Sequence, residues 1–272
     1  MARIPFVRAL STFLLGDPAH RLQRMIFREA ARGFRLEQPA FPREIHLPPA
    51  FGVGLPERVV ELVLARSTYV PGARVLDVGH SNIMECHRLL LNSLTPPKHF
   101  TGVDIAAPTY DVSPYYERSI IADITNTGLA ADSFDRIWCI STLEHVGMDN
   151  TGYTGNFTLD GDLDASALRE MYRVLAADGT LLITVPFGKS ENHGWMKNYD
   201  LSAWHRLLDP FRGYAHVYEH YFRYDRTAGW MQVEASRLAA TGYYDNRNAG
   251  ASGLATVLVH KPVVERIAGE RP

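Results

Sequence analysis

The chain has 272 residues, 46% of them hydrophobic and 21% charged, with a formal net charge of −2. This length suits one α/β domain with extensions, or two small domains. The slightly acidic balance excludes a generally basic nucleic-acid-binding protein. No apolar run approaches the roughly 18 to 20 residues that cross a bilayer, so we expect a cytoplasmic protein. Cys86 and Cys139 fall in a predicted helix and a predicted strand, which is typical of small buried side chains in a reducing compartment.

The first 35 residues are basic, because seven arginines face only Asp17 and Glu29 as opposing charges. Apolar stretches separate the arginines, and we predict a basic helical extension over residues 1–40. A basic amphipathic helix either packs on its own domain or binds an anionic membrane surface or a partner protein. Packing on the domain is the commoner use and is favoured here. The alternative is a peripheral membrane location or a partner contact through residues 1–35.

Helical and strand-like patterns alternate after the proline- and glycine-rich residues 38–56, which we expect to form a loop. Apolar residues at helical spacing predict helices, and short apolar runs followed by turn signals predict buried strands. Asp162 or Asp164 is available as the N-cap of the last of these helices, and Gly179 as its end. The predicted helices cover 57–70, 83–94 and 165–179, and the predicted strands cover 73–79, 99–105, 118–124, 134–142 and 180–188.

The C-terminal part of the chain has two further strand-like segments, 215–225 and 253–262, with a helical pattern at 229–242 between them. Strands that alternate with helices predict a parallel sheet covered on both faces. We therefore predict a doubly wound, Rossmann-like α/β fold over residues 41–265. Its mostly parallel sheet is expected to have seven strands, with one strand of the terminal pair antiparallel at the edge.

Acidic residues end three successive predicted strands. Asp77, Asp104 and Asp123 follow the first, second and third strands. Ligands of open α/β sheets bind at the carboxyl ends of the strands, and a carboxylate after the second strand accepts hydrogen bonds from ribose hydroxyls. Asp123 next to Ile124 suits an adenine, because the acid can take the amino group while the apolar side chain covers the ring. The pattern predicts an adenosine cofactor.

Residues 58–188 resemble the class I S-adenosylmethionine-dependent methyltransferases. The resemblance rests on the segments "VLDVG", "GVDI", "IIADITNTGLAADSFDRIWCISTLEHV" and "LREMYRVLAADGTLLITVPFG". It implies S-adenosyl-L-methionine as the cofactor. Taken residue by residue, it implies Asp77 and Gly79 near the methionine end, Asp104 on the ribose, Asp123 and Ile124 at the adenine, and Ser141 beside the cofactor. Ile105, which follows Asp104, is also predicted to bind the cofactor.

Two departures from the family pattern lie in the cofactor region. Where the family places further glycines, this chain has His80-Ser81-Asn82. We expect His80 and Asn82 either to fill the turn or to touch the methionine end, and Asn82 tolerates the left-handed conformation best among non-glycine residues. The second departure follows Asp104, where two prolines predict a loop in place of a helix.

The acceptor side is predicted from the polar insertion 146–164 and the segment 188–230. A hydroxyl acceptor loses its proton as the methyl group transfers, so His145, His193 and Asp200 are candidate bases. The alternative role for His145 is a histidine at a helix end bound by a backbone group. No metal is expected, because the alternating aspartates of the insertion lack the glycine and the glutamate of a calcium loop and suit helix capping.

The sequence thus predicts a methyltransferase that acts on a small-molecule or glycan hydroxyl. The insertion and the segment "ENHGWMKNYD" resemble methyltransferases encoded with bacterial surface-polysaccharide pathways, which favours a sugar acceptor. A first alternative is an NAD-dependent Rossmann oxidoreductase, but the G-x-G-x-x-G motif that approaches a pyrophosphate is absent. A second alternative is a non-catalytic binding module of the same fold.

Overall fold

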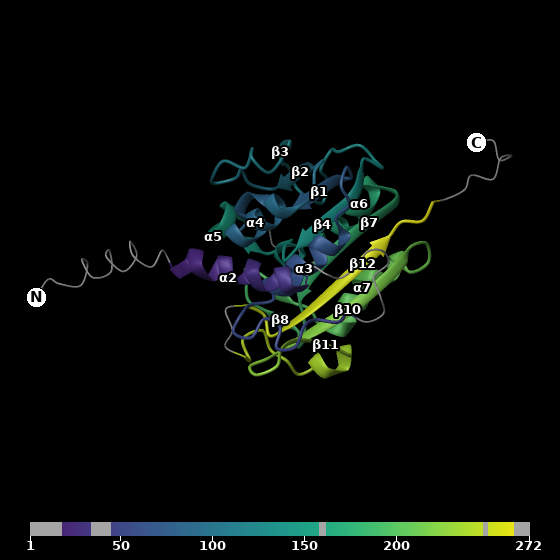
Figure 1. The fold of residues 1–272 in the computed structure, drawn as a ribbon. Helices are drawn as coiled ribbons and strands as arrows, with labels where there is room; N and C mark the ends of the chain where they lie inside the picture. Colours follow the sequence, from purple (N-terminus) through teal and green to yellow (C-terminus); the bar gives the residue numbers. More distant parts are fainter. Residues whose placement is uncertain (1–17, 34–44, 158–161, 247–249, 264–272) are drawn as a thin grey trace, which may run out of the picture.

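The centre of the protein is an eight-stranded sheet, seen in a computed structural model that describes residues 18–33, 45–157, 162–246 and 250–263 (Figure 1). Helices cover both faces, so the predicted doubly wound α/β fold is confirmed. In spatial order the strands are β11 (Gly229–Val233), β10 (His216–Asp225), β12 (Gly253–His260), β7 (Leu175–Pro186), β4 (Phe134–Ile140), β1 (Arg74–Val78), β2 (His99–Asp104) and β3 (Arg118–Ile121).

The strands β3, β2, β1, β4 and β7 run parallel, which places their carboxyl ends at one edge of the sheet. Strand β12 lies antiparallel between β7 and β10, and the edge strand β11 is antiparallel to β10. Two short hairpins lie outside this sheet. They consist of β5 (Asp149–Asn150) with β6 (Asn156–Phe157), and of β8 (Glu191–Asn192) with β9 (Lys197–Asn198).

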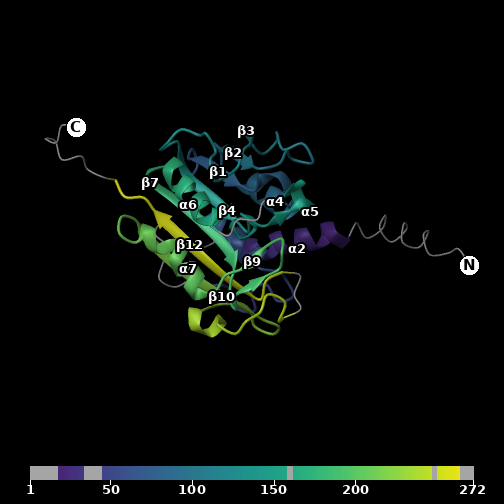
Figure 2. The same ribbon diagram turned by 180° about the vertical axis from the view of Figure 1, so that it is seen from behind.

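The helices divide between the two faces of the sheet. Those of the first face stand in front of the sheet in Figure 1, and those of the second face stand in front in Figure 2, which is the view from behind. The first face carries α2 (Pro18–Gly33), α3 (Arg58–Thr68) and α4 (Glu85–Ser93). The second carries α6 (Leu163–Val174) and α7 (Leu201–Leu208), and a short helix, α5 (Thr151–Thr154), lies in the insertion.

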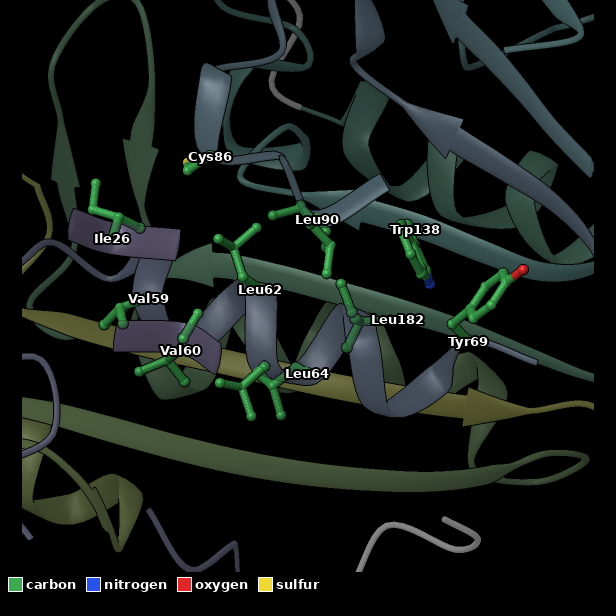
Figure 3. Packing of buried hydrophobic residues seen from close by; sticks show 14 of the residues in the cluster. Ile26, Val59, Val60, Leu62, Leu64, Tyr69, Cys86, Leu90, Trp138 and Leu182 are labelled. Atoms are coloured by element: carbon green, nitrogen blue, oxygen red, sulfur yellow. The ribbon is translucent and has the colours of Figure 1, made fainter. Parts of the chain in front are cut away.

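Alternate residues of the central strands enter the two cores. Trp138 and Leu182 pack with α3 and α4, whereas Ile137 and Cys139 point to the α6 and α7 side. Figure 3 shows part of the first core, with Trp138 and Leu182 facing helix α3. A strand that is buried on both faces has a continuous apolar sequence, which is why these segments show no polar alternation. Both cysteines are buried, as predicted.

Helix α2 packs on α3 and α4 through buried Ile26 and Ala30. In the same contact with α4, His20 and Arg24 bind the carboxylate of Glu85 at the start of that helix. The described part of the basic extension therefore lies on the domain, while residues 1–17 fall outside the described residues. Within the described ranges, no helix has the length and apolar character needed to span a membrane.

Two predictions about the secondary structure were wrong. The segment 229–242 was predicted to be a helix, but it begins with strand β11 and continues with a 3-10 turn at Ala235–Leu238. Pairing with β10 and burial of Trp230 outweigh the helical spacing of its apolar residues, and this added strand gives eight strands where seven were expected.

The helix predicted over 165–179 is α6, which ends at Val174 and not at Gly179. Its last carbonyls are satisfied by other segments, because Asp132 N–H donates to Arg173 O and Ser133 N–H to Val174 O. Leu175 then pairs with Phe134 as the first residue of β7. The long-range pairing thus ends the helix earlier than the local sequence indicates.

Candidate active site

A cavity of about 430 Å³ lies at the carboxyl ends of β1, β2, β4 and β7. This volume lies within the range of small-molecule sites. His80, His193 and Asp200 do not line the cavity. The other predicted site residues do: Asp77, Gly79, Asn82, Asp104, Ile105, Asp123, Ile124, Ser141 and His145.

Asp77, at the end of β1, is held from two directions. It is 2% exposed and accepts a hydrogen bond of 2.6 Å from the Tyr116 hydroxyl. The Nε2 atom of His87, on α4, lies 3.0 Å from the same carboxylate oxygen. A buried carboxylate needs such partners, and here they fix the orientation of Asp77 at the cavity wall.

Asp104 and Asp123 are each held by a neighbouring turn. Oδ2 of Asp104 accepts the Ser81 backbone N–H at 2.9 Å. Oδ1 of Asp123 accepts both the backbone N–H and the hydroxyl of Thr125 at 2.8 Å. Oδ1 of Asp104 also accepts the Ala106 backbone N–H, at the longer distance of 3.4 Å. Both acids are therefore oriented by backbone groups at the cavity. As predicted, residues 105–117 between β2 and β3 contain no helix.

The turn after β1 keeps one glycine for a steric reason. Gly79 has φ of 90°, and a Cβ atom there would lie 2.3 Å from Oγ1 of Thr142. A 3-10 turn over His80–Asn82 follows. Asn82 is exposed at the cavity and has no positive φ, so the left-handed conformation considered for it is not found.

His80 packs inside the protein, away from the cavity. It is completely buried, and its Nε2 lies 2.6 Å from the Ser119 hydroxyl on β3. Gly102 on β2 makes room for the ring, since a Cβ atom at position 102 would lie 2.3 Å from His80 Cγ. The structure therefore assigns His80 to filling the turn, one of the two roles expected for it.

His145 lies at the end of a 3-10 turn over Leu143–His145, and its ring is bound by a backbone group. Its Nδ1 lies 3.0 Å from the backbone oxygen of Trp195, and the two rings stack with centroids 5.2 Å apart. A carbonyl only accepts hydrogen bonds, so Nδ1 carries the hydrogen and Nε2 has the lone pair. Burial lowers the pKa of His145 below 6.5, which favours the neutral ring.

The other two predicted bases have structural positions. Asp200 is the N-cap of α7, and its carboxylate accepts the Ala203 N–H at 2.7 Å. An aspartate directly before a helical pattern is a recognisable N-cap signal. The ring of His193 packs against Tyr243 and Tyr244, with centroids 5.5 Å apart in both pairs.

Sequence reasoning missed several residues that line the cavity, among them Glu57, Arg58, Glu144 and Tyr243. One signal was available for the first two. Helices in a doubly wound fold run antiparallel to the strands, so the start of a helix that precedes a strand lies at the carboxyl edge. Glu57 and Arg58 occupy that position at the beginning of α3.

Arg58 and Glu61 form an ion pair that joins the cavity wall to the sheet. Nη1 of Arg58 lies 3.0 Å from Oε2 of Glu61, which is completely buried. The other Glu61 oxygen accepts the Ser141 hydroxyl at 2.6 Å and the Thr184 hydroxyl at 2.7 Å. Ser141 is thus positioned by Glu61, and its φ of 43° is in the left-handed region.

Glu57 and Glu144 lie in surroundings that favour their neutral forms. Burial, followed by the charge of Glu61, raises the pKa of Glu57 to about 7. Burial also raises the pKa of Glu144 well above its ordinary value. Glu57 Oε2 accepts the Ala251 N–H at 2.9 Å, and Glu144 Oε1 lies 3.9 Å from Nε2 of His145.

Metal ligands do not gather at this site. Across the described ranges, no group of three or more His, Cys, Asp or Glu side chains has the arrangement of a metal centre. The cavity instead combines carboxyl groups, one guanidinium, the two imidazole rings of His87 and His145, and apolar walls.

Comparison with known proteins matches residues 76–183 to a family described as "Methyltransferase domain". The matched segment begins in β1 and ends in β7, so it covers the central strands and the acids at their ends. No curated protein sequence matches the chain.

Solved structures share the fold at low identity. The [4+2]-cyclase SpnF is 15% identical with a TM-score of 0.51, over 90% of this chain and 97% of the cyclase. The Burkholderia thailandensis 1,6-didemethyltoxoflavin-N1-methyltransferase, solved with 1,6-didemethyltoxoflavin and S-adenosylhomocysteine, is 14% identical with a TM-score of 0.49, over 75% of this chain and 77% of that chain. A chain of the complex between the Haloferax volcanii Trm112 methyltransferase activator and a putative methyltransferase is 15% identical with a TM-score of 0.49, over 92% of this chain and all of that chain.

Proposed function

Because the chain carries a class I S-adenosylmethionine-dependent methyltransferase domain, we propose that it methylates a hydroxyl group of a sugar or another small polar acceptor. The observation that carries this proposal is the state of His145. Its Nδ1 is bound to the Trp195 carbonyl, and its pKa is lowered by burial, so Nε2 is an unprotonated base at neutral pH. Glycan assembly is the setting that we favour for such an acceptor.

S-adenosylmethionine fits the residues at one end of the cavity, which we call the cofactor end (Asp77, Gly79, Asp104 and Asp123). We assign Asp104 to the ribose, Asp123 with Ile124 to the adenine, and Asp77 with Gly79 to the methionine end. The missing Cβ at Gly79 lets the chain turn beside Thr142, and this cofactor has no phosphate that would need further glycines. When bound, it supplies a methyl group on a positively charged sulfur.

The opposite end, which we call the acceptor end, holds Glu57, Glu144 and His145. A hydroxyl is a weak nucleophile until its proton is removed, and a positioned base contributes about 10²- to 10⁴-fold to the rate of such a step. His145 is suited to accept this proton through Nε2. The insertion adds Val146, Gly147, Asn150 and Leu163 to the wall on this side.

Calorimetry tests the cofactor assignment. We expect S-adenosylmethionine and S-adenosylhomocysteine to bind and NAD not to bind. Asp104→Ala should weaken the binding by about 10- to 100-fold, as expected for a lost charge-assisted hydrogen bond. Asp209→Ala, at an exposed site after α7, is the matched control and should bind as the wild type does. Binding of NAD alone would contradict the proposal.

Methyl transfer tests the acceptor assignment. The protein is incubated with methyl-labelled S-adenosylmethionine and a panel of sugars and nucleotide sugars, and products are identified by mass spectrometry and NMR. We expect an O-methylated product, and a rate loss of about 100-fold or more in His145→Gln with cofactor affinity retained. A product methylated at carbon or nitrogen, or an unchanged rate in this variant, would contradict the assignment.

A further inference from the structure

The acceptor end contains more carboxyl groups than cations. Glu57 and Glu144 line the cavity, and Glu61 contacts two further lining residues, Arg58 and Ser141. Arg58 is the one lysine or arginine side chain among the described residues that line the cavity, and it is paired with Glu61. Among the described residues no ion pair joins Glu57 or Glu144 to a lysine or arginine side chain, although the charge of Arg58 acts on both.

Glu144 has an oxygen that the protein does not use. The residue is 3% exposed and lines the cavity, and its Oε2 is buried with no hydrogen-bond partner in the described parts of the chain. Leaving a buried polar atom unpaired destabilises the folded protein. An unpaired buried oxygen in a residue that lines the cavity favours a ligand that brings a hydrogen-bond donor to this side chain.

Glu57 is positioned for the same purpose. Its Oε2 is fixed by the Ala251 N–H, and the chain at Gly250 passes so close that a Cβ atom there would lie 1.9 Å from this oxygen. These contacts hold the carboxyl group at the N-terminus of α3, beside the cavity. The group is therefore oriented before any ligand binds.

Two aromatic residues complete this end of the cavity. Trp195 and Tyr243 both line it. Tyr243 is fixed by its own N–H, which donates to Glu191, and by its ring contacts with His193 and Tyr244. Carboxyl groups together with aromatic rings are the chemistry that recognises an ammonium ion.

We propose that the methyl acceptor carries an ammonium group, and that Glu57 and Glu144 bind this group at the end of the cavity lined by Trp195 and Tyr243. The acceptor class is then an amino sugar or a similar amino polyol, whose hydroxyl group lies toward His145. This inference rests on the proposed function, since it describes the acceptor of the same site. Burial favours the neutral forms of both carboxyl groups, and an ammonium group bound beside them favours their ionised forms, which a neutral sugar does not do.

The test measures binding to the protein loaded with S-adenosylhomocysteine, so that no turnover is involved. Ligand-observed NMR titrations compare D-glucosamine with D-glucose and N-acetyl-D-glucosamine, which lack the positive charge. We expect D-glucosamine to bind at least about 10-fold more tightly than the other two, which corresponds to one net charge-assisted hydrogen bond. Glu57→Gln and Glu144→Gln should each abolish the preference, and Glu234→Gln, at an exposed site, should keep it.

Equal binding of the three sugars, or binding of none of them, overturns the inference. A preference that survives in both cavity variants also overturns it. The inference fails as well if these variants weaken S-adenosylmethionine but not S-adenosylhomocysteine, because the carboxyl groups would then serve the cofactor's positive sulfur. Glu57→Gln keeps an oxygen for the Ala251 N–H, so it remains informative if Glu144→Gln fails to fold. A wild-type protein that binds neither cofactor form refutes the proposed function itself.

Discussion

At the cofactor end of the cavity, Asp77, Asp104 and Asp123 each accept hydrogen bonds from neighbouring groups of the protein. At the acceptor end, Glu57 accepts one, and Oε2 of Glu144 accepts none within the described parts of the chain. The first set is oriented and stabilised before a ligand arrives. The second set is held in surroundings that raise the pKa values of both glutamates. This difference indicates that the carboxyl groups of the acceptor end depend more on a ligand for their hydrogen bonds than those of the cofactor end do.

The largest expected effect concerns the ion pair that supports the acceptor end. Glu61→Gln keeps an oxygen for the Ser141 and Thr184 hydroxyls but removes the charge that faces Arg58. Breaking a buried ion pair from one side costs about 3–5 kcal/mol. We expect the free energy of unfolding, measured in urea, to fall by about this amount. If the free energy of unfolding falls no more than in the exposed control Glu234→Gln, the ion pair between Arg58 and Glu61 does not stabilise the fold.

The second prediction concerns the packing under the cofactor end. In Gly102→Ala, the new Cβ atom would lie 2.3 Å from the His80 ring, so His80 and the following turn must shift. Overpacking of this kind costs about 1–3 kcal/mol. We expect a loss of stability and, because Ser81 braces Asp104, weaker binding of S-adenosylmethionine in calorimetry.

Two further variants make this test specific. His80→Ala opens the space that the new methyl group needs, so the double variant should lose clearly less stability than the sum of the single losses. Gly213→Ala, where a Cβ atom would meet nothing within 4 Å, is the matched control. Additive losses in the double variant would mean that His80 and Gly102 are not coupled.

The contact between His80 and Gly102 is an example of a feature that the sequence pattern did not predict. The pattern of strands predicted the fold and the edge at which Asp77, Asp104 and Asp123 meet, because carboxyl ends of parallel strands share one edge. It did not predict that His80 turns inward, since the space for its ring is made by a residue 22 positions later. Local sequence does not encode such a long-range contact.

The acceptor end was harder to predict for a related reason. His145 was identified from its place after β4, but Glu57 and Arg58 come from a helix that precedes the matched segment. Asp200 and His193 were predicted from their place in the polar segment after β7. In the structure Asp200 caps a helix and His193 packs against Tyr243. Polar residues in a loop carry no periodic signal that separates these roles.

The third prediction concerns the pH dependence of stability that Glu57 causes at the acceptor end. The pKa of Glu57 is raised from 4.5 to about 7, so the folded state favours its protonated form. Its contribution to stability is therefore present below pH 4.5 and lost as pH rises through 7. Glu57→Gln is neutral at every pH. We expect the free energy of unfolding of this variant, relative to that of the wild type, to rise by about 1–3 kcal/mol from pH 5 to pH 8, since one pKa unit corresponds to about 1.4 kcal/mol. Urea unfolding at both pH values measures this gain, and a pH-independent difference would contradict it.

The smallest expected effect is a shift in the titration of His145. Burial lowers its pKa, the Trp195 carbonyl opposes this by binding the Nδ1 hydrogen, and the charge of Arg58 lowers it further. In ¹⁵N-labelled protein, we expect a neutral ring at pH 7, with the hydrogen on Nδ1 and a midpoint below 6.5. His99, on the exposed start of β2, provides a comparison in the same spectra.

His145 lies on the acceptor end, so the midpoint of its titration should respond to the charge there. Glu61→Gln leaves the positive charge of Arg58 uncompensated and should lower the midpoint further. A His145 ring that is charged at pH 7, or that carries its hydrogen on Nε2, is in the wrong state to accept a proton from a hydroxyl group, and would remove the observation on which the proposed function rests.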